Sequence, residues 1–331
     1  MDNAWQDKKV LVTGAGGFIG SHLVEALVLR SANVRAMAHY NSRGDLGLLR
    51  YVPSDILEKV DIIGADLRDA YAVRSAVTDC EVVFHLGALI SIPYSYVHPG
   101  EVVEANVLGT MNVLLACRDL GVKRLVHTST SEVYGTAQYA PIDEKHPLQA
   151  QSPYSGTKIA ADKLAESFYR TYSMDVVTVR PFNTYGPRQS ARAVIPTIIT
   201  QALARKTIYL GNLETIRDFT FVDDTVEGFI LASESERVSG KTLNLGTGTE
   251  IKIGAIAQKI IELTGSTASV EIDPERFRPK DSEVFRLISD HTVMTELTGW
   301  RPRVSLDEGL SRTIEWISRH LNHYKIGKYA I

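Results

Sequence analysis

The chain has 331 residues, with 36 Lys and Arg against 39 Asp and Glu, which gives a formal net charge of −3. Apolar residues make up 44% and charged residues 23% of the chain, as in an ordinary globular protein. This length predicts about two domains. The composition excludes a disulfide-rich miniprotein and a basic nucleic-acid-binding module, and no apolar run approaches the ~18 residues of a transmembrane helix. Small anionic ligands remain compatible with it, because they need only a few placed cations.

The two cysteines, Cys80 and Cys117, both lie in apolar stretches. We expect them to be buried free thiols, which are typical of a reducing compartment. The first nine residues lack the apolar segment of a signal peptide. The sequence therefore favours a cytoplasmic protein.

Short β-rich runs alternate with longer amphipathic segments in the first half of the chain. Strands are predicted at Lys9–Thr13, Val34–Ala38, Asp61–Gly64, Val82–Leu86, Arg124–Thr128 and Val176–Arg180. Helical patterns between them cover Phe18–Arg30, Tyr71–Val77, Glu101–Asp119 and Pro153–Tyr172. Continuous apolar strands separated by helices indicate right-handed crossovers and an α/β fold, a doubly wound parallel sheet of the Rossmann type.

The composition changes after Arg180, where Pro, Gly and Arg become frequent. Further elements are expected as a helix at Ala193–Lys206, a strand at Arg217–Val222, a helix capped by Asp223 or Asp224 that runs to Ala232, and a strand at Lys241–Leu245. Because this last strand is expected to rejoin the first sheet, we predict two interleaved domains. Residues 1–182 with about 219–250 form the sheet domain, and residues 183–218 with 251–331 form a smaller α/β domain.

A glycine-rich turn follows the first predicted strand. Gly14, Gly17 and Gly20 have the spacing Gly-x-x-Gly-x-x-Gly, and a helix is expected to begin at Phe18. Glycine permits the tight turn and lets backbone N–H groups approach a pyrophosphate, while the helix N-terminus adds its positive dipole end. A turn of this kind between a strand and a helix predicts a dinucleotide-binding loop.

The end of the second strand bears on the choice of cofactor. An acid there bonds the ribose 2′-OH of NAD, whereas an Arg can meet the 2′-phosphate of NADP. No acidic residue occurs between Glu25 and Asp45, and the polar residues of this segment are His39, Asn41, Ser42 and Arg43. Asp66, after the third strand, can accept a hydrogen bond from the adenine amino group. NAD and NADP therefore both remain open.

Tyr154 and Lys158 form Tyr-x-x-x-Lys at the start of a predicted helix, so both side chains share one face. A phenol with an ordinary pKa near 10 is a poor base, and bringing that pKa towards 7 requires about 4 kcal/mol of phenolate stabilisation. A neighbouring ammonium and an oxidised nicotinamide can together supply this stabilisation. After a dinucleotide loop, this spacing predicts a catalytic pair.

Seven motifs spread over nearly the whole chain resemble the extended short-chain dehydrogenase/reductase superfamily of nucleotide-sugar epimerases and dehydratases. They are G-A-G-G-F-I-G, D-L-R-D, H-L-G-A, S-T-S-E-V-Y-G, Y-S-G-T-K, R-P-F-N-T-Y-G-P-R and R-D-F-T-F-V-D-D. The resemblance implies that Tyr154 takes the sugar O4 proton while a hydride passes to a tightly held NAD or NADP that is recycled each turnover. The smaller domain would then bind the nucleotide sugar.

The resemblance also implies the other site residues. Those at the cofactor are Gly14, Gly17, Phe18, Ile19, Gly20, Asp66, Leu67, Leu86, Ala88, Lys158 and Pro181. Those at the substrate are Asn183, Arg188, Arg217 and Arg278, since Arg can bind phosphate through two parallel hydrogen bonds. Ser91 joins this group because it follows the fourth strand, where ligand loops of such folds lie.

Thr130, Ser131 and Glu132 follow the fifth strand and distinguish the possible reactions. Epimerisation at C4 needs no second base, whereas 4,6-dehydration needs a base for the C5 proton and an acid for the departing C6 hydroxyl. Glu132 is placed to be that base, and Ser131 or Glu132 to supply the acid. Thr-Ser-Glu resembles GDP-mannose 4,6-dehydratases, and it resembles UDP-glucuronate decarboxylases as well. A UDP-hexuronate decarboxylase, a 4-epimerase and a catalytically silent dinucleotide-binding scaffold are the alternatives.

Longer stretches at Thr128–Gln149 and Arg180–Gln201 resemble the UDP- or GDP-N-acetylglucosamine 4,6-dehydratases of legionaminic acid-type pathways. That family also implies a homodimer in which Glu101–Asp119 and Pro153–Tyr172 form a four-helix bundle with the partner. The apolar residues Val102, Val103, Val107, Val113 and Leu114 fit burial in the core or in that interface.

The histidines do not predict a metal centre. His85, His98, His127 and His146 lack metal-ligand spacing with one another or with the cysteines. His127 lies in an apolar strand and is expected to be a hydrogen-bonded core residue.

Overall fold

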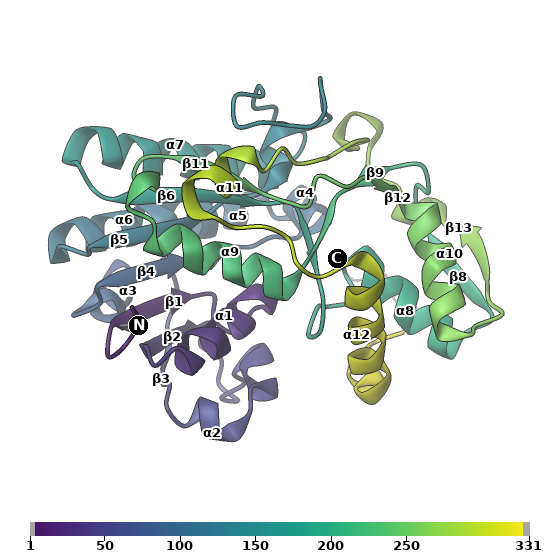
Figure 1. Ribbon diagram of the computed structural model, residues 1–331, viewed down its shortest axis with the longest axis horizontal. Coiled ribbons are helices and arrows are strands. Elements are labelled where there is room, and N and C mark those ends of the chain that lie inside the picture. Colours follow the sequence, from purple (N-terminus) through teal and green to yellow (C-terminus); the bar gives the residue numbers. More distant parts are fainter. Residues whose placement is uncertain (1–3, 327–331) are drawn as a thin grey trace.

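A seven-stranded parallel sheet forms the centre of the computed structural model, which describes residues 4–326 (Figure 1). Its strand order is β11-β6-β5-β4-β1-β2-β3. The strands are β1 (Lys9–Thr13), β2 (Asn33–Ala38), β3 (Asp61–Gly64), β4 (Val82–His85), β5 (Arg124–Thr128), β6 (Val176–Pro181) and β11 (Thr242–Leu245). The predicted doubly wound α/β fold is thereby confirmed, and each of the six strands expected in the first half is present within one residue at either end.

Helices cover both faces of the sheet. One face carries α3 (Ala70–Val77), α5 (Pro99–Val103), α6 (Gly109–Leu120) and α7 (Pro153–Tyr172), and the other carries α1 (Phe18–Leu29), α9 (Val222–Glu234) and α11 (Thr292–Thr298). Short helices α2 (Ser54–Leu57) and α4 (Ile92–Val97) lie in the connections. Among the described residues, no helix is both long and apolar enough to cross a membrane.

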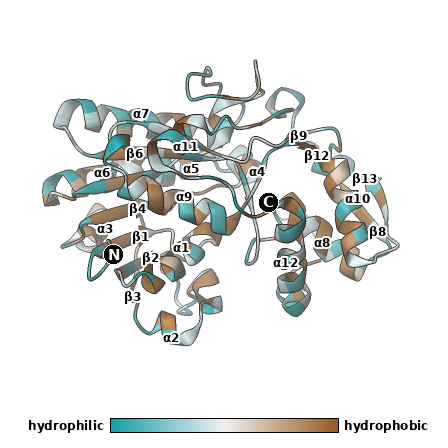
Figure 2. Ribbon diagram, viewed as in Figure 1, coloured by the Kyte–Doolittle hydropathy of each residue, from teal (hydrophilic) through white to brown (hydrophobic). Residues whose placement is uncertain are grey.

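Alternate residues of each strand enter two separate cores. Val10 and Val12 of β1 pack with Leu23 of α1, whereas Leu11 between them packs with Leu114 of α6 and Phe168 of α7. All of these side chains are buried. Strands covered on both faces must be apolar along their whole length, and Figure 2 shows the central strands in brown for this reason.

The rest of the chain builds a smaller layer beside the carboxyl ends of the strands. It contains α8 (Val194–Ala204), α10 (Ile253–Thr264), α12 (Leu306–Arg319) and the pairs β7 (Asn183–Tyr185) with β10 (Phe219–Phe221), β8 (Thr207–Leu210) with β13 (Ser269–Ile272), and β9 (Ile216–Arg217) with β12 (Ile251–Lys252). Single 3-10 turns are η1 (Gly47–Tyr51), η3 (Ser131–Tyr134), η4 (Glu236–Val238), η5 (Pro274–Arg276), η6 (Lys280–Ser282) and η7 (Leu321–His323). Strand β11 pairs with β6, as expected for the strand near residue 241, while the exact domain limits stay a prediction.

Three local expectations were wrong. The helix predicted over Glu101–Asp119 is interrupted by a π-helical turn, η2 (Glu104–Leu108). The strand predicted over Arg217–Val222 is divided at Asp218, whose buried carboxylate accepts hydrogen bonds from the backbone N–H groups of residues 247, 248 and 289. Asp224 does not cap α9; its carboxylate accepts from the N–H groups of residues 303 and 304, and α9 begins without a side-chain cap.

For each side chain, the structure tests the burial predicted for the cysteines and for the apolar residues between 102 and 114. Cys80 and Cys117 are buried free thiols, as predicted. Val102, Val113 and Leu114 are buried within the described chain, whereas Val103 is exposed.

Candidate active site

The turn between β1 and α1 is built to hold an anion. Gly14 has φ +68°, and a Cβ on Gly20 would lie 2.3 Å from the Gly14 carbonyl oxygen. The N-cap residue Gly17 supplies no side-chain cap, and the first turn of α1 contains no acidic residue. The exposed N–H groups and the positive end of the helix dipole therefore remain available to a phosphate. This cradle fits the pyrophosphate of a dinucleotide.

A second wall comes from the segment after β4, which contains Leu86 and Ala88. The hydroxyl of Thr13 accepts from the Gly87 N–H at 3.1 Å, so this segment stays close to the glycine loop. Asn106, in the π-helical turn, bonds the N–H and carbonyl of Leu89 at 2.8 and 2.9 Å and donates to Thr157 Oγ1 at 3.0 Å. Asn106 thus ties the wall to α7. Sequence reasoning missed it, because one Asn in a helical pattern carries no signal of its own.

The residues predicted to contact the adenosine fall into two sets: some form hydrogen bonds within the protein, and others are exposed. Arg68 donates to both carboxylate oxygens of Asp66, and this hydrogen bonding lowers the pKa of Asp66 to about 2. His39 lies 3.4 Å from the same carboxylate. The Asn41 side chain shapes its own loop by accepting from the N–H groups of residues 43 and 45, whereas Ser42 and Arg43 are exposed. These contacts leave both cofactors compatible with the loop.

The predicted catalytic pair, Tyr154 and Lys158, lies at the start of α7, which is firmly capped. Ser152 accepts from the Ser155 N–H at 3.1 Å, and Ser155 Oγ accepts from the Ser152 N–H at 3.0 Å, a capping box with Pro153 in the first turn. Tyr154 and Lys158 are both buried on the same helix face. Lys158 Nζ donates to the Thr128 carbonyl oxygen at 2.6 Å, which fixes the ammonium against the end of β5.

Burial dominates the electrostatics of Tyr154. Burial raises the pKa of Tyr154 well above its ordinary value, and the charge of Glu132 adds to that rise. A hydrogen bond with Thr130 acts in the opposite direction. Burial lowers the pKa of Lys158 itself to about 8. The polypeptide alone therefore keeps Tyr154 a neutral phenol near pH 7.

Glu132 lies among arginines on the substrate side of the site. Its carboxylate is 3.7 Å from Arg278 Nη1, a buried nitrogen without a hydrogen-bond partner among the described residues. Arg217 is buried, its Nη2 lies 3.9 Å from Glu283, and burial lowers the pKa of Arg217. The Asn183 Oδ1 is likewise buried and without a hydrogen-bond partner in the part of the chain that is described. A bound anion would satisfy the unpaired Arg278 nitrogen and the desolvated Arg217 guanidinium, whereas the Asn183 oxygen would accept from a hydroxyl or N–H group of a ligand.

A family model described as GDP-mannose 4,6 dehydratase matches residues 11–313. The chain belongs to the extended short-chain dehydrogenase/reductase family of nucleotide-sugar dehydratases and epimerases. It is 35% identical over 315 residues to a UDP-glucose 4-epimerase of Mycolicibacterium smegmatis, covering 93% of this chain and 98% of that protein. It is 34% identical over 313 residues to a dTDP-glucose 4,6-dehydratase of Streptomyces antibioticus, covering 93% and 91%.

A solved structure supports the same family membership. DesIV, a dTDP-glucose 4,6-dehydratase from Streptomyces venezuelae determined with NAD bound, has a TM-score of 0.86 and 28% identity. The match covers 96% of this chain and 99% of that one. This protein is therefore an enzyme of the nucleotide-sugar dehydratase and epimerase family, and these relatives include both reaction types.

Two of the expected substrate residues make contacts within the protein. Arg188 Nη2 donates to Glu25 of α1 at 2.5 Å and to the Tyr51 carbonyl oxygen at 3.3 Å, which joins Arg188 to the sheet domain, and its role at the substrate stays a prediction. Ser91 caps α4 by accepting from the Tyr94 N–H at 3.4 Å.

The other cofactor residues lie on the elements expected to hold them. Phe18 and Ile19 open α1, and Pro181 ends β6. The Leu67 side chain lies against Gly87, where a Cβ would be 2.8 Å from Leu67 Cδ1. Residues 4–326 contain no group of three metal-ligating side chains arranged to hold an ion.

Proposed function

We propose that the protein is a nucleotide-sugar 4,6-dehydratase that acts on UDP- or GDP-N-acetylglucosamine with NAD or NADP. The observation that carries the proposal is Glu132: a half-buried carboxylate, one turn from the fifth strand, beside Tyr154 and within 3.7 Å of Arg278. An epimerase has no step for a second carboxylate, whereas elimination needs a base and an acid at this place.

Each residue then has one task. Arg217, Arg278 and Asn183 hold the diphosphate and orient the sugar. Tyr154 accepts the proton of the C4 hydroxyl, Glu132 removes the C5 proton and returns a proton to the departing C6 hydroxyl, and Thr130 holds the Tyr154 hydroxyl in place. A nicotinamide held by the glycine cradle would supply the hydride acceptor for C4 and the hydride donor for C6, where C5 also regains one proton, and its oxidised form would add the positive charge that favours the Tyr154 phenolate.

We further propose that the enzyme is a homodimer. Apolar side chains are exposed along α4, α5 and the turn that follows, and the members of this group are Val97, Val103 and Leu108. They lie beside α7, so a four-helix bundle with a second copy would cover them.

The function is tested with a panel of nucleotide sugars analysed by mass spectrometry. UDP- or GDP-N-acetylglucosamine should lose one molecule of water without net reduction of the cofactor. Glu132→Gln should slow this elimination by roughly 10²–10⁴-fold, the usual contribution of a general acid–base group, while hydride transfer from C4 to the cofactor continues. Loss of carbon dioxide from a UDP-hexuronate, or an isomer of unchanged mass, would instead identify a decarboxylase or an epimerase.

A further inference from the structure

Helix α7 carries a third buried polar residue on the face that holds the catalytic pair. Tyr154, Lys158 and Asp162 follow one another at intervals of four residues, which places them on one side of the helix. Asp162 is only 5% exposed. Nothing in the proposed reaction uses this carboxylate, although a buried charge is costly unless it is fully paired.

Asp162 joins α7 to the two strands beneath it. Its Oδ1 lies 3.0 Å from His127 Nε2 on β5, and its Oδ2 accepts from Ser129 Oγ at 2.7 Å. Arg180 on β6 donates to Oδ2 through Nε at 3.1 Å and Nη2 at 2.9 Å. All three partners are buried, so the carboxylate is held from several sides.

The two β5 partners of Asp162 flank the residue that holds the catalytic lysine. Thr128 lies between His127 and Ser129, and its carbonyl oxygen accepts from Lys158 Nζ at 2.6 Å. Because Asp162 bonds the residue on each side, it fixes the direction of the Thr128 carbonyl relative to α7. Thr130, which bonds Tyr154, is the next polar residue along the same segment.

Asp162 also acts on Lys158 through its charge. Burial lowers the pKa of Lys158, and the Asp162 carboxylate partly reverses this effect. Burial lowers the pKa values of His85 and His127, which therefore remain neutral near pH 7. The charged and titratable groups around Lys158 are Tyr154 and Asp162 on α7, Glu132 on η3, His85 on β4, His127 on β5 and Arg180 on β6.

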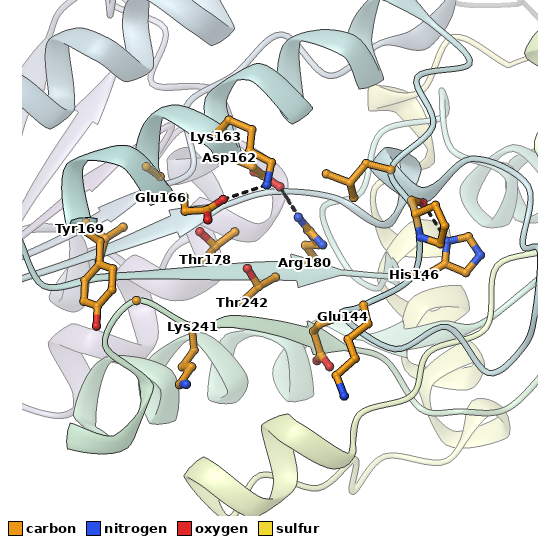
Figure 3. Close-up of a pocket in the computed structure, with 16 residues that line it drawn as sticks. Glu144, His146, Asp162, Lys163, Glu166, Tyr169, Thr178, Arg180, Lys241 and Thr242 are labelled. Atoms are coloured by element: carbon orange, nitrogen blue, oxygen red, sulfur yellow. Dashed lines mark hydrogen bonds and ion pairs between the residues drawn. The ribbon is translucent and has the colours of Figure 1, made fainter. Parts of the chain in front are cut away.

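Arg180 supplies the positive charge that pairs with the Asp162 carboxylate. Figure 3 shows Asp162 and Arg180 joined at the lining of a cavity of about 420 Å³ between the second half of α7 and the β6–β11 edge. Arg180 Nη1 donates to the Tyr134 hydroxyl at 2.9 Å, which in turn donates to Asn244 on β11 at 2.7 Å. Asp162 thus has the guanidinium on its cavity side and the catalytic segment on the other.

We propose that Asp162 is a positioning residue for the catalytic pair: its carboxylate anchors β5 on both sides of Thr128 and keeps the Lys158 ammonium charged against that carbonyl. The inference rests on the proposed roles of Tyr154 and Lys158. It predicts that Asp162 sets the alkaline limit of the reaction, because Lys158 must be protonated to favour the Tyr154 phenolate.

The test compares Asp162→Asn with Glu166→Gln, which removes a half-buried carboxylate one turn later on α7 that pairs only with residues of α7 itself, Lys163 and Arg170, among the described residues. Lys158 is charged below its pKa of about 8 and loses its charge as the pH rises through that value. Removing the carboxylate lowers this pKa further, so the alkaline limit of kcat should move down by about 1 pH unit in Asp162→Asn, with KM little changed. Asp162→Glu should restore the limit, and Glu166→Gln should keep it.

A second readout separates this inference from the proposed function. The rate at which Lys158 is acylated at different pH values, followed by peptide mass spectrometry, reports its protonation without any turnover, and its midpoint should move in the same direction. If Asp162→Asn does not fold, because Arg180 then lacks its partner, Asp162→Asn with Arg180→Met takes its place. An unchanged alkaline limit and midpoint, with activity reduced equally at all pH values, would overturn the inference. A fully active Tyr154→Phe would overturn the proposed function instead.

Discussion

The helices α1 and α7 both begin at the site, and their first turns are built in opposite ways. At α1, the N-cap Gly17 offers no side chain and the first turn has no acid, so the N–H groups are left for a ligand. At α7, Ser152 and Ser155 satisfy each other's backbone N–H groups in a complete capping box. In the proposed enzyme, the open end would receive an anion, and the closed end would hold Tyr154 in a rigid turn. A helix terminus can thus contribute to a site either by binding a ligand with its free N–H groups or by fixing the position of a side chain in its first turn.

The largest effect is expected from the closed end. Tyr154→Phe keeps the cap and the burial but removes the hydroxyl, so kcat should fall roughly 10²–10⁴-fold, the usual contribution of general acid–base catalysis. Cofactor affinity should change little. Both are measured by turnover of the active nucleotide sugar and by titration with NAD and NADP. A fall in cofactor affinity that matches the fall in kcat would show that the two helix ends are not separate in function.

A smaller effect is expected from the open end. In Gly20→Ala the new Cβ would lie 2.3 Å from the Gly14 carbonyl oxygen, so the loop must shift. Strain of this kind typically costs about 1–3 kcal/mol, which should weaken NAD or NADP binding by roughly 5–150-fold. Gly100→Ala is the matched control, since a Cβ there meets no atom within 4 Å. Equal cofactor affinity in the two variants would contradict the assignment of the loop.

The smallest effect is expected from loosening the cap. Ser152→Ala should lower the free energy of unfolding by about 1 kcal/mol and also reduce kcat, because Tyr154 sits in the turn that the cap holds. Ser305→Ala removes an equivalent cap from α12, where Ser305 accepts from the Glu308 N–H. It should cost similar stability in thermal unfolding and leave kcat unchanged. A loss of kcat in Ser305→Ala as well would mean that stability alone accounts for the effect.

The parts of the molecule that were predictable are those in which short-range patterns decide the outcome. Strand β6 and helix α7 were expected almost to the residue, because a continuous apolar run and a Ser-Pro start with regular apolar spacing each admit few alternatives. The tight glycine turn between β1 and α1 was likewise predictable, because its conformation depends on residues within one turn.

The remainder depends on partners distant in the chain. Asp224 resembles a helix cap in sequence, but the N–H groups of residues 303 and 304 bind it. Arg188 pairs with Glu25, which lies 163 residues earlier in the chain, and no pattern near either residue predicts this pair. The π-helical turn at Glu104–Leu108 follows from packing on α7 and the β4 loop, where Asn106 is needed. The sequence around a carboxylate does not indicate whether its hydrogen-bond donors are neighbours in the chain or residues that the fold brings in from a distant segment.

The position of strand β11 in the sequence determines when the central sheet can be completed during synthesis. It pairs with β6 at the end of the sheet, although the whole of β7 to α9 separates the two in sequence. A nascent chain that ends before β11 leaves the outer edge of β6 open, and unpaired edges invite association with other strands. Asn244 of β11 also accepts from the Tyr134 hydroxyl, one hydrogen bond away from Arg180. The region around the catalytic helix is therefore completed only after the intervening layer has been synthesised, so the two halves of this protein must mature together.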